Sequence, residues 1–200
     1  MSQGHDTGSP RLAGLRPGEL TAEQAAVYEH IAGGERASGP QYFELVDAEG
    51  RLNGPFNAML LSPGLGDALQ GLGAAIRYQS SLSGRVREMA ILAVAAHWES
   101  EFERYAHEPI GRAAGLTEDE IAALGKHQSL TLLDPAEYVA LRVVRALLAS
   151  DGLDDAGYAA AREHLSEAEL FELTTLVGYY ATLALMMRVF DVGAPGQSQP

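Results

Sequence analysis

The side chains best able to carry out chemistry lie in one short stretch that ends at His107. Glu103 and His107 are four residues apart, so on a helix they share a face and come within reach of each other. A carboxylate beside an imidazole fixes the tautomer of the ring and makes it a better base. The pair predicts general acid–base catalysis, with His107 as proton donor or shuttle and Glu103 orienting it. The alternative is a solvated Glu–His pair on an acidic surface.

Glu88 is the third candidate catalytic residue, and we expect it to be a second, partly buried acid or base. On a helix it shares one stripe with Ile91, Ala95 and Trp98, at steps of three and four residues. It is therefore the acid that begins a buried stripe. The alternative is an exposed acid that interacts with the positive end of the helix macrodipole.

Four further residues are candidates for binding a substrate rather than reacting with it. Arg85 could hold a carboxylate in bidentate fashion, or it could pair with a surface acid. His97 and Trp98 end an apolar helix and could add polar groups to a pocket. Tyr179 could form a pocket wall, although packing in the core is the alternative for it as for His97 and Trp98.

Helices must position these residues. Ser83 is a good N-cap, and residues 89–96 after it contain no polar side chain, which predicts a helix buried on every side. In the next helix Pro109 cannot donate to the carbonyl of Tyr105. We expect the backbone beside His107 to be kinked or interrupted there.

The rest of the chain also predicts helices. Capping boxes begin at Thr21, Thr117 and Ser166, and Ser-Pro and Asp-Pro pairs at 62–63 and 134–135 are typical helix starts. We expect a loop over residues 53–57. No segment shows the two-residue alternation of a strand. The sequence therefore predicts an all-α fold, with a disordered leader at 1–19, one helical domain at 20–192 and a disordered tail at 193–200.

Several classes of function lack their sequence signatures. The net charge of −13 argues against nucleic acid and anionic membranes as partners. No cysteine is present, so thiolate, disulfide and iron–sulfur chemistry are excluded. The motifs of metal, nucleotide and serine-hydrolase sites are missing. No signal peptide is visible, and residues 173–190 are too short and interrupted for a comfortable membrane span. We therefore expect a cytoplasmic protein that needs no metal or cofactor.

Three segments carry a resemblance to a known family: SGRVREMAILAVA from residue 83, SEFERYAH from residue 100 and AAGLTEDEI from residue 113. Together they resemble the carboxymuconolactone decarboxylase family, whose superfamily contains the alkylhydroperoxidase D proteins. A weaker likeness covers residues 170–192. The resemblance implies an all-helical subunit of the alkylhydroperoxidase D-like type that assembles into homotrimers or hexamers. It also implies a pocket for a small-molecule substrate between the buried helix and the next one.

Carried over residue by residue, the resemblance makes Glu88 the family's acid and His107 its histidine. The peroxidase branch has a Cys-x-x-Cys before that histidine, where this chain has Ser100 and Glu103. The resemblance therefore implies not a thiol peroxidase but a cofactor-free lyase that decarboxylates a small carboxylated or enolisable, lactone-like compound.

Two alternatives stay open. The same site could catalyse isomerisation, dehydration, cyclisation or retro-aldol cleavage in a specialised biosynthetic pathway. The chain could also form a non-catalytic oligomer that binds a small molecule, and exposed, widely separated positions for Glu88, Glu103 and His107 would favour that interpretation.

Overall fold

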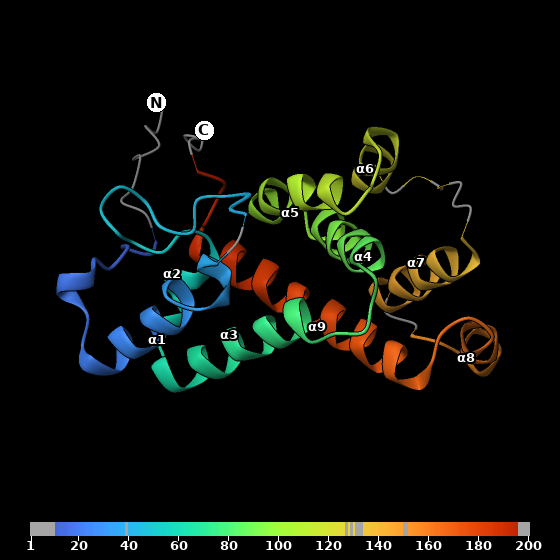
Figure 1. The fold of residues 1–200 in the computed structure, drawn as a ribbon, viewed down its shortest axis with the longest axis horizontal. Coiled ribbons are helices and arrows are strands. Elements are labelled where there is room, and N and C mark those ends of the chain that lie inside the picture. The colour runs from blue at the N-terminus through green and yellow to red at the C-terminus, as the bar shows by residue number, and fades with distance from the viewer. Residues whose placement is uncertain are drawn as a thin grey trace, which may run out of the picture.

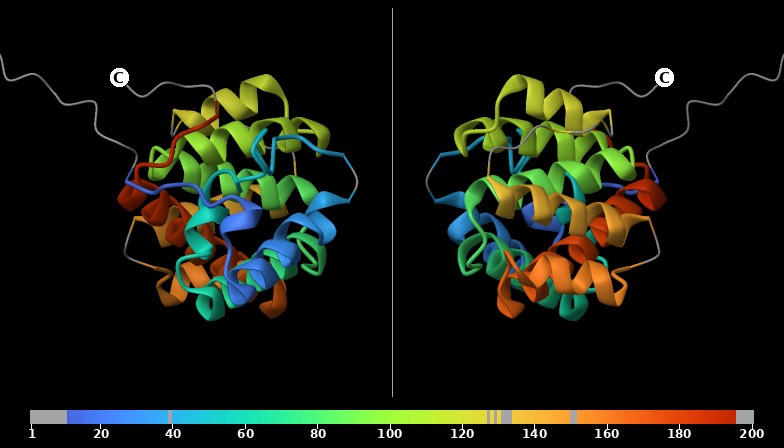
Figure 2. Two further views of the ribbon diagram at one scale, coloured as in Figure 1. Left: turned by 90° about the vertical axis from the view of Figure 1, so that its left-hand side faces the viewer. Right: turned by 90° about the vertical axis from the view of Figure 1, so that its right-hand side faces the viewer.

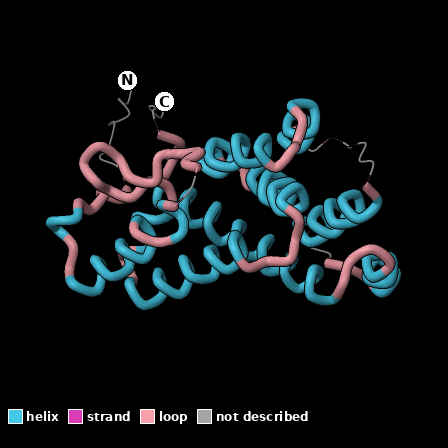
Figure 3. The backbone as a smooth tube through the Cα atoms, viewed as in Figure 1, coloured by secondary structure: helices cyan, strands magenta, loops and turns pink. Residues whose placement is uncertain are grey.

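The computed structural model describes residues 11–38, 40–126, 128, 130, 134–149 and 152–195, and these residues confirm the predicted all-α fold. No described segment is drawn as a strand in Figure 3, and the β-type pairing found in these ranges is an isolated bridge between Val46 and Leu52. The helices, labelled in Figure 1, are α1 Ala22–Ala32, α2 Pro55–Met59, α3 Pro63–Tyr78, α4 Gly84–His97, α5 Glu101–Ala113, α6 Glu118–Gly125, α7 Pro135–Leu148, α8 Asp155–Arg162 and α9 Glu167–Phe190. Two short 3₁₀ turns lie at Pro17–Glu19 and Glu35–Ala37.

The helix starts lie where the capping signals predict them. Ser83 accepts a hydrogen bond from the backbone N–H of Val86 at 3.1 Å and begins α4. Capping boxes at Thr21, Thr117 and Ser166 begin α1, α6 and α9. These caps satisfy N–H groups that have no partner inside the helix. They fix where each helix starts without help from tertiary packing.

The apolar helix α4 lies at the centre of the fold. Every residue from Met89 to Ala96 is buried, as its all-apolar sequence predicts. It packs against α5, α6, α7 and α9, so neighbours cover it on all sides. Figure 2 shows these helices stacked around it from both ends of the molecule. Residues on α4 are thereby held in one place relative to α5 and α9.

Helices α1, α2 and α3 form the other end of the fold. In Figure 1 they lie on the opposite side from α7 and α8, and α9 runs between the two groups. Both α2 and α3 pack on α9, which contacts α4 along its buried face. Among the described residues α9 is long and apolar enough, by length and composition alone, to cross a membrane. Half of that apolar window is buried inside the protein, and a core helix meets the same criteria.

Three expectations about the backbone are corrected. The first concerns the loop expected at 53–57: Pro55 begins α2, because proline at the first helical position loses no intrahelical hydrogen bond. The second concerns Pro109, which lies inside α5 without interrupting it. Proline removes one hydrogen bond, and the packing of Phe102 and Ile110 in the core keeps the helix continuous.

The third correction concerns the leader. Its described part is tied to the protein: the N–H of Leu15 donates to Asn57 Oδ1 at 3.3 Å, and Asn57 Nδ2 donates to the carbonyl of Ala13 at 3.4 Å. Leu15 also packs against the core. Residues 11–19 are therefore part of the helical domain, and residues 1–10 lie outside the described residues. In the predicted tail Ala194 is buried, and residues 196–200 lie outside the described residues.

Gly54 shows why one turn before α2 needs glycine. Its φ is +60°, a value that other residues rarely adopt. A Cβ built on it would lie 2.2 Å from the ring of Phe102. The backbone at residue 54 therefore packs directly against an aromatic side chain of α5.

Candidate active site

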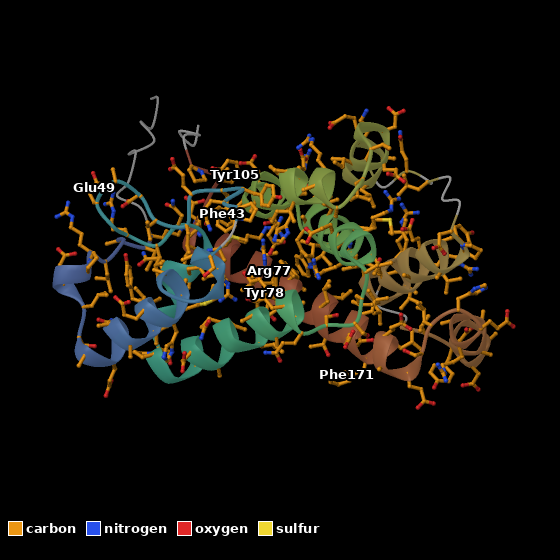
Figure 4. The ribbon with its side chains drawn as sticks, in the orientation of Figure 1. Phe43, Glu49, Arg77, Tyr78, Tyr105 and Phe171 are labelled. Atoms are coloured by element: carbon orange, nitrogen blue, oxygen red, sulfur yellow. The ribbon has the colours of Figure 1, made fainter. Side chains whose placement is uncertain are left out.

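A cavity of about 50 Å³ lies where α3, α5 and α9 meet the segment 40–43. Its walls are mostly aromatic. Its polar lining is small and comes from Arg36, Gln41, Arg77, Glu103 and His107, with Tyr42, Phe43, Phe56, Tyr78, Phe102, Tyr179 and Tyr180 among the aromatic walls. Figure 4 labels three of these residues, Phe43, Arg77 and Tyr78, between the end of α3 and α5. An apolar cavity with a few convergent polar groups is the usual form of a small-molecule site.

His107 lines this cavity and is held from behind by Glu88. Its Nδ1 lies 2.8 Å from Glu88 Oε2, across 19 residues of sequence and between two helices. Both side chains are buried. No described residue forms a hydrogen bond to the other ring nitrogen, Nε2. Because Glu88 accepts from Nδ1–H, the neutral ring carries its lone pair on Nε2, where it can take or return a proton.

Glu88 is kept as a carboxylate although it is only 1% exposed. Burial raises its pKa, but His107, Arg87 and Arg77 together outweigh burial and hold the pKa below the ordinary value. Arg87 Nε lies 3.4 Å from Glu88 Oε1, so the two carboxylate oxygens face different partners. The sequence analysis gave Glu88 two alternatives, and the structure has the buried one.

Glu103 also lines the cavity, but it does not orient His107 as we expected. Neither of its carboxyl oxygens has a hydrogen-bond partner among the described residues, and its side chain is only 2% exposed. Burial raises its pKa well above the ordinary value. The carboxyl group is therefore a neutral acid with one O–H to donate. It lies one turn before His107, and Glu88 on the neighbouring helix takes the place at Nδ1 instead.

Two tyrosines of α9 form the wall beside the imidazole. The ring of Tyr180 meets the ring of His107 edge to face, with centroids 5.2 Å apart. Tyr179 stands against Tyr180 in the same manner and lies in the cavity wall, as predicted for it. Burial raises the pKa of Tyr179 to about 12 and that of Tyr180 further, so both hydroxyls are protonated at neutral pH. They can donate hydrogen bonds but cannot act as bases.

Three of the predicted binding residues lie away from the cavity. Arg85 pairs with Glu137 at 2.7 Å and with Glu120 at 2.8 Å, and it joins α4 to α6 and α7. The structure thus has the alternative in which Arg85 pairs with acids. His97 is exposed, and Trp98 is partly buried against the core. Neither of them lines the cavity.

The sequence analysis missed the two arginines that do line the cavity, Arg36 and Arg77. A signal for Arg77 was present in α3. Gly66, Gln70 and Gly73 are buried at steps of four and three residues, and Arg77 lies four residues further on the same stripe. Gly73 matters for the same wall, because a Cβ there would lie 2.1 Å from the Tyr179 hydroxyl.

The described residues contain no group of three or more His, Asp or Glu side chains that could hold a metal ion. The chemistry available from these residues is therefore proton transfer and hydrogen bonding. Glu88 and His107 supply a buried base with a fixed tautomer, and Glu103 supplies a neutral acid on the same cavity.

Comparison with known proteins agrees with the resemblance predicted from the sequence. The model of the carboxymuconolactone decarboxylase family matches residues 63–146, which include α3 to α6 and most of α7. A search of the curated proteins finds no match.

Solved structures share the fold at low sequence identity. An alkylhydroperoxidase AhpD core protein from Ralstonia eutropha has a TM-score of 0.72 at 14% identity, with 94% of this chain and 93% of that chain covered. The debrominase Bmp8 has a TM-score of 0.68 at 14% identity, with 92% and 91% covered. A protein of unknown function from Agrobacterium tumefaciens has a TM-score of 0.63 at 22% identity, with 70% and 97% covered.

Proposed function

Residues 63–146 place this chain in the carboxymuconolactone decarboxylase family, and from that premise we propose that it is a cofactor-independent acid–base enzyme. Its substrate is a small carboxylated or enolisable compound, and its simplest reaction is decarboxylation. The observation that carries the proposal is the cavity itself. A neutral, unpaired Glu103 and a His107 positioned by Glu88 line one small aromatic pocket.

Decarboxylation requires two things that these residues can supply. When the bond to the carboxylate breaks, carbon dioxide leaves and its electron pair remains on the substrate as an enolate. The O–H of Glu103 can donate a hydrogen bond to the enolate oxygen, since burial keeps that group protonated. The imidazolium of His107 can then deliver the Nε2 proton to carbon, and solvent returns a proton to the ring afterwards.

Glu88 acts through His107 in this scheme. Its carboxylate stabilises the imidazolium and keeps the Nδ1–H in place, because it is buried and bonded to that atom. General acid–base catalysis contributes roughly 10²–10⁴-fold. Positioning in the cavity and hydrogen bonding to the enolate oxygen must supply the remainder of the rate enhancement.

The two alternatives fare differently. Isomerisation, dehydration, cyclisation and retro-aldol cleavage need the same base and acid, so they remain reactions of the same site. The non-catalytic binding oligomer is less favoured, because Glu88, Glu103 and His107 are all buried. A related fold does act on a small ring compound: a cysteine-to-alanine variant of the debrominase Bmp8 has been solved with 2,3,4-tribromopyrrole.

The test is proton exchange and carbon dioxide release on a panel of β-keto acids and unsaturated lactone acids in D₂O, followed by NMR. We expect the wild type to act on at least one member and His107→Asn to lose about 10²-fold or more of that rate. His97→Asn is the matched control, because His97 is exposed and lies outside the cavity. A wild type inert on the whole panel, or a His107→Asn variant with an unchanged rate, would refute the assignment.

A further inference from the structure

Arg77 is a cation without a counterion in the part of the chain that the structure describes. It is partly buried at the end of α3 and lines the cavity. Its guanidinium lies 5.8 Å from the ring centroid of Tyr78, and no described residue accepts a hydrogen bond from it or pairs with it. A partly buried guanidinium carries five N–H donors, and leaving them without acceptors costs free energy.

The other arginine of the cavity, Arg36, has a different environment. Its guanidinium donates to the side chain of Gln70 at 3.0 Å and to the Gln70 carbonyl at 2.8 Å. It also lies over the ring of Phe56, 5.4 Å from the centroid. These partners are neutral, so they hold Arg36 in place but leave its charge uncompensated.

The charges that line the cavity do not balance. Arg36 and Arg77 are positive, and Glu103 is neutral because burial keeps it protonated. Glu88 is negative, but it lies behind His107 and its oxygens already face His107 and Arg87. The lining is therefore positive, in a chain whose net charge is −13. An anion that entered the cavity would find donors with no internal competitor.

We propose that the cavity selects a small planar carboxylate and that Arg77 is the residue that recognises its negative charge. The guanidinium of Arg77 matches a carboxylate in bidentate geometry, and the aromatic walls beside it suit a flat, conjugated body. This inference rests on the proposed function for the location of the substrate. It goes further, because it assigns the substrate's charge and the residue that binds it.

Binding measurements test this independently of turnover. The probes are furan-2-carboxylate and its neutral isostere furan-2-carboxamide, with affinity measured by ligand-observed NMR and calorimetry on the full chain. We expect the wild type to bind the carboxylate about tenfold more tightly or better, and Arg77→Met to weaken carboxylate binding roughly ten- to hundredfold. Arg77→Lys should keep part of the preference, because it keeps the charge but loses the bidentate geometry.

Arg142→Met is the matched control. Arg142 also lies over a tyrosine, 6.0 Å from the ring centroid of Tyr138, but it is exposed on α7 and outside the cavity. We expect it to leave both affinities unchanged. Circular dichroism and thermal unfolding establish that each variant is folded, and Arg77→Lys serves if the methionine variant is not.

The inference is overturned if the wild type binds the two probes equally or does not bind the carboxylate at millimolar concentration. It is also overturned if Arg77→Met keeps the preference. Failure of the proposed function looks different: carboxylate selectivity then persists, but the wild type catalyses no proton exchange. Failure of the inference alone leaves His107-dependent exchange intact and removes the selectivity.

Discussion

The buried carboxyl group of Glu103 makes a prediction about stability that does not depend on any substrate. In the unfolded chain this carboxyl loses its proton near the ordinary pKa of 4.5, whereas in the folded protein burial keeps it protonated to a much higher pH. Between those two values the folded state binds one proton more than the unfolded state. The free energy of unfolding must therefore fall as the pH rises through that window.

The magnitude follows from one proton. Each pH unit in the window lowers the free energy of unfolding by about 1.4 kcal/mol, so the change between pH 5 and pH 7 is up to about 2.7 kcal/mol. Glu103→Gln has nearly the same shape but cannot ionise, so it lacks this loss. Its advantage in stability over the wild type is expected to be small at pH 5 and to grow as the pH rises.

Urea unfolding at pH 5, 6, 7 and 8 measures this difference by linear extrapolation. Taking the difference between variant and wild type cancels the titration of every other group. Glu101→Gln is the control, because Glu101 lies on the same helix and is exposed, so its difference from the wild type should stay flat. A flat difference for Glu103→Gln between pH 5 and pH 7 would refute the buried neutral acid and, with it, the hydrogen-bond donor proposed for the enolate.

Two further substitutions are checked by the same unfolding assay. Gly73→Ala places a Cβ 2.1 Å from the Tyr179 hydroxyl and should cost about 1–3 kcal/mol, whereas Gly71→Ala, with nothing within 4 Å, should stabilise α3 by about 0.5–1 kcal/mol; equal effects would contradict the packing described for this wall. Arg85→Met leaves Glu120 and Glu137 without their cation and should cost roughly 2 kcal/mol, while the rate per folded molecule is unchanged. A lost rate in the folded Arg85→Met variant would return Arg85 to the binding site.

Local signals in the sequence predicted most of the fold. A capping box satisfies N–H groups within four residues, so the starts of α1, α6 and α9 could be predicted from Thr21, Thr117 and Ser166 alone. The burial of α4 followed from eight apolar residues in a row. Pro109 misled the analysis because the cost of one lost hydrogen bond is local, whereas the packing that outweighs it comes from neighbouring helices.

The candidate site was predicted in its residues but not in its pairing. Helical spacing brings Glu103 and His107 to one face, and from that spacing Glu103 was assigned to the imidazole. The partner at Nδ1 is Glu88, 19 residues away on another helix, and only the packing of α4 against α5 determines that contact. Arg77 was missed for the same reason, since its position on the buried stripe of α3 shows its value only when α9 and α5 complete the cavity.

The close approach of Gly54 to Phe102 bears on how the pocket can be redesigned. Phe102 stands between Phe43 and Tyr105, so a residue that contacts no ligand fixes the orientation of three aromatic rings around the entrance. Saturation mutagenesis would find position 54 restricted to glycine and Tyr42, more exposed on the rim, far more permissive. Engineering of new specificity should begin on the rim at residues 41–43 and leave the glycine behind it untouched.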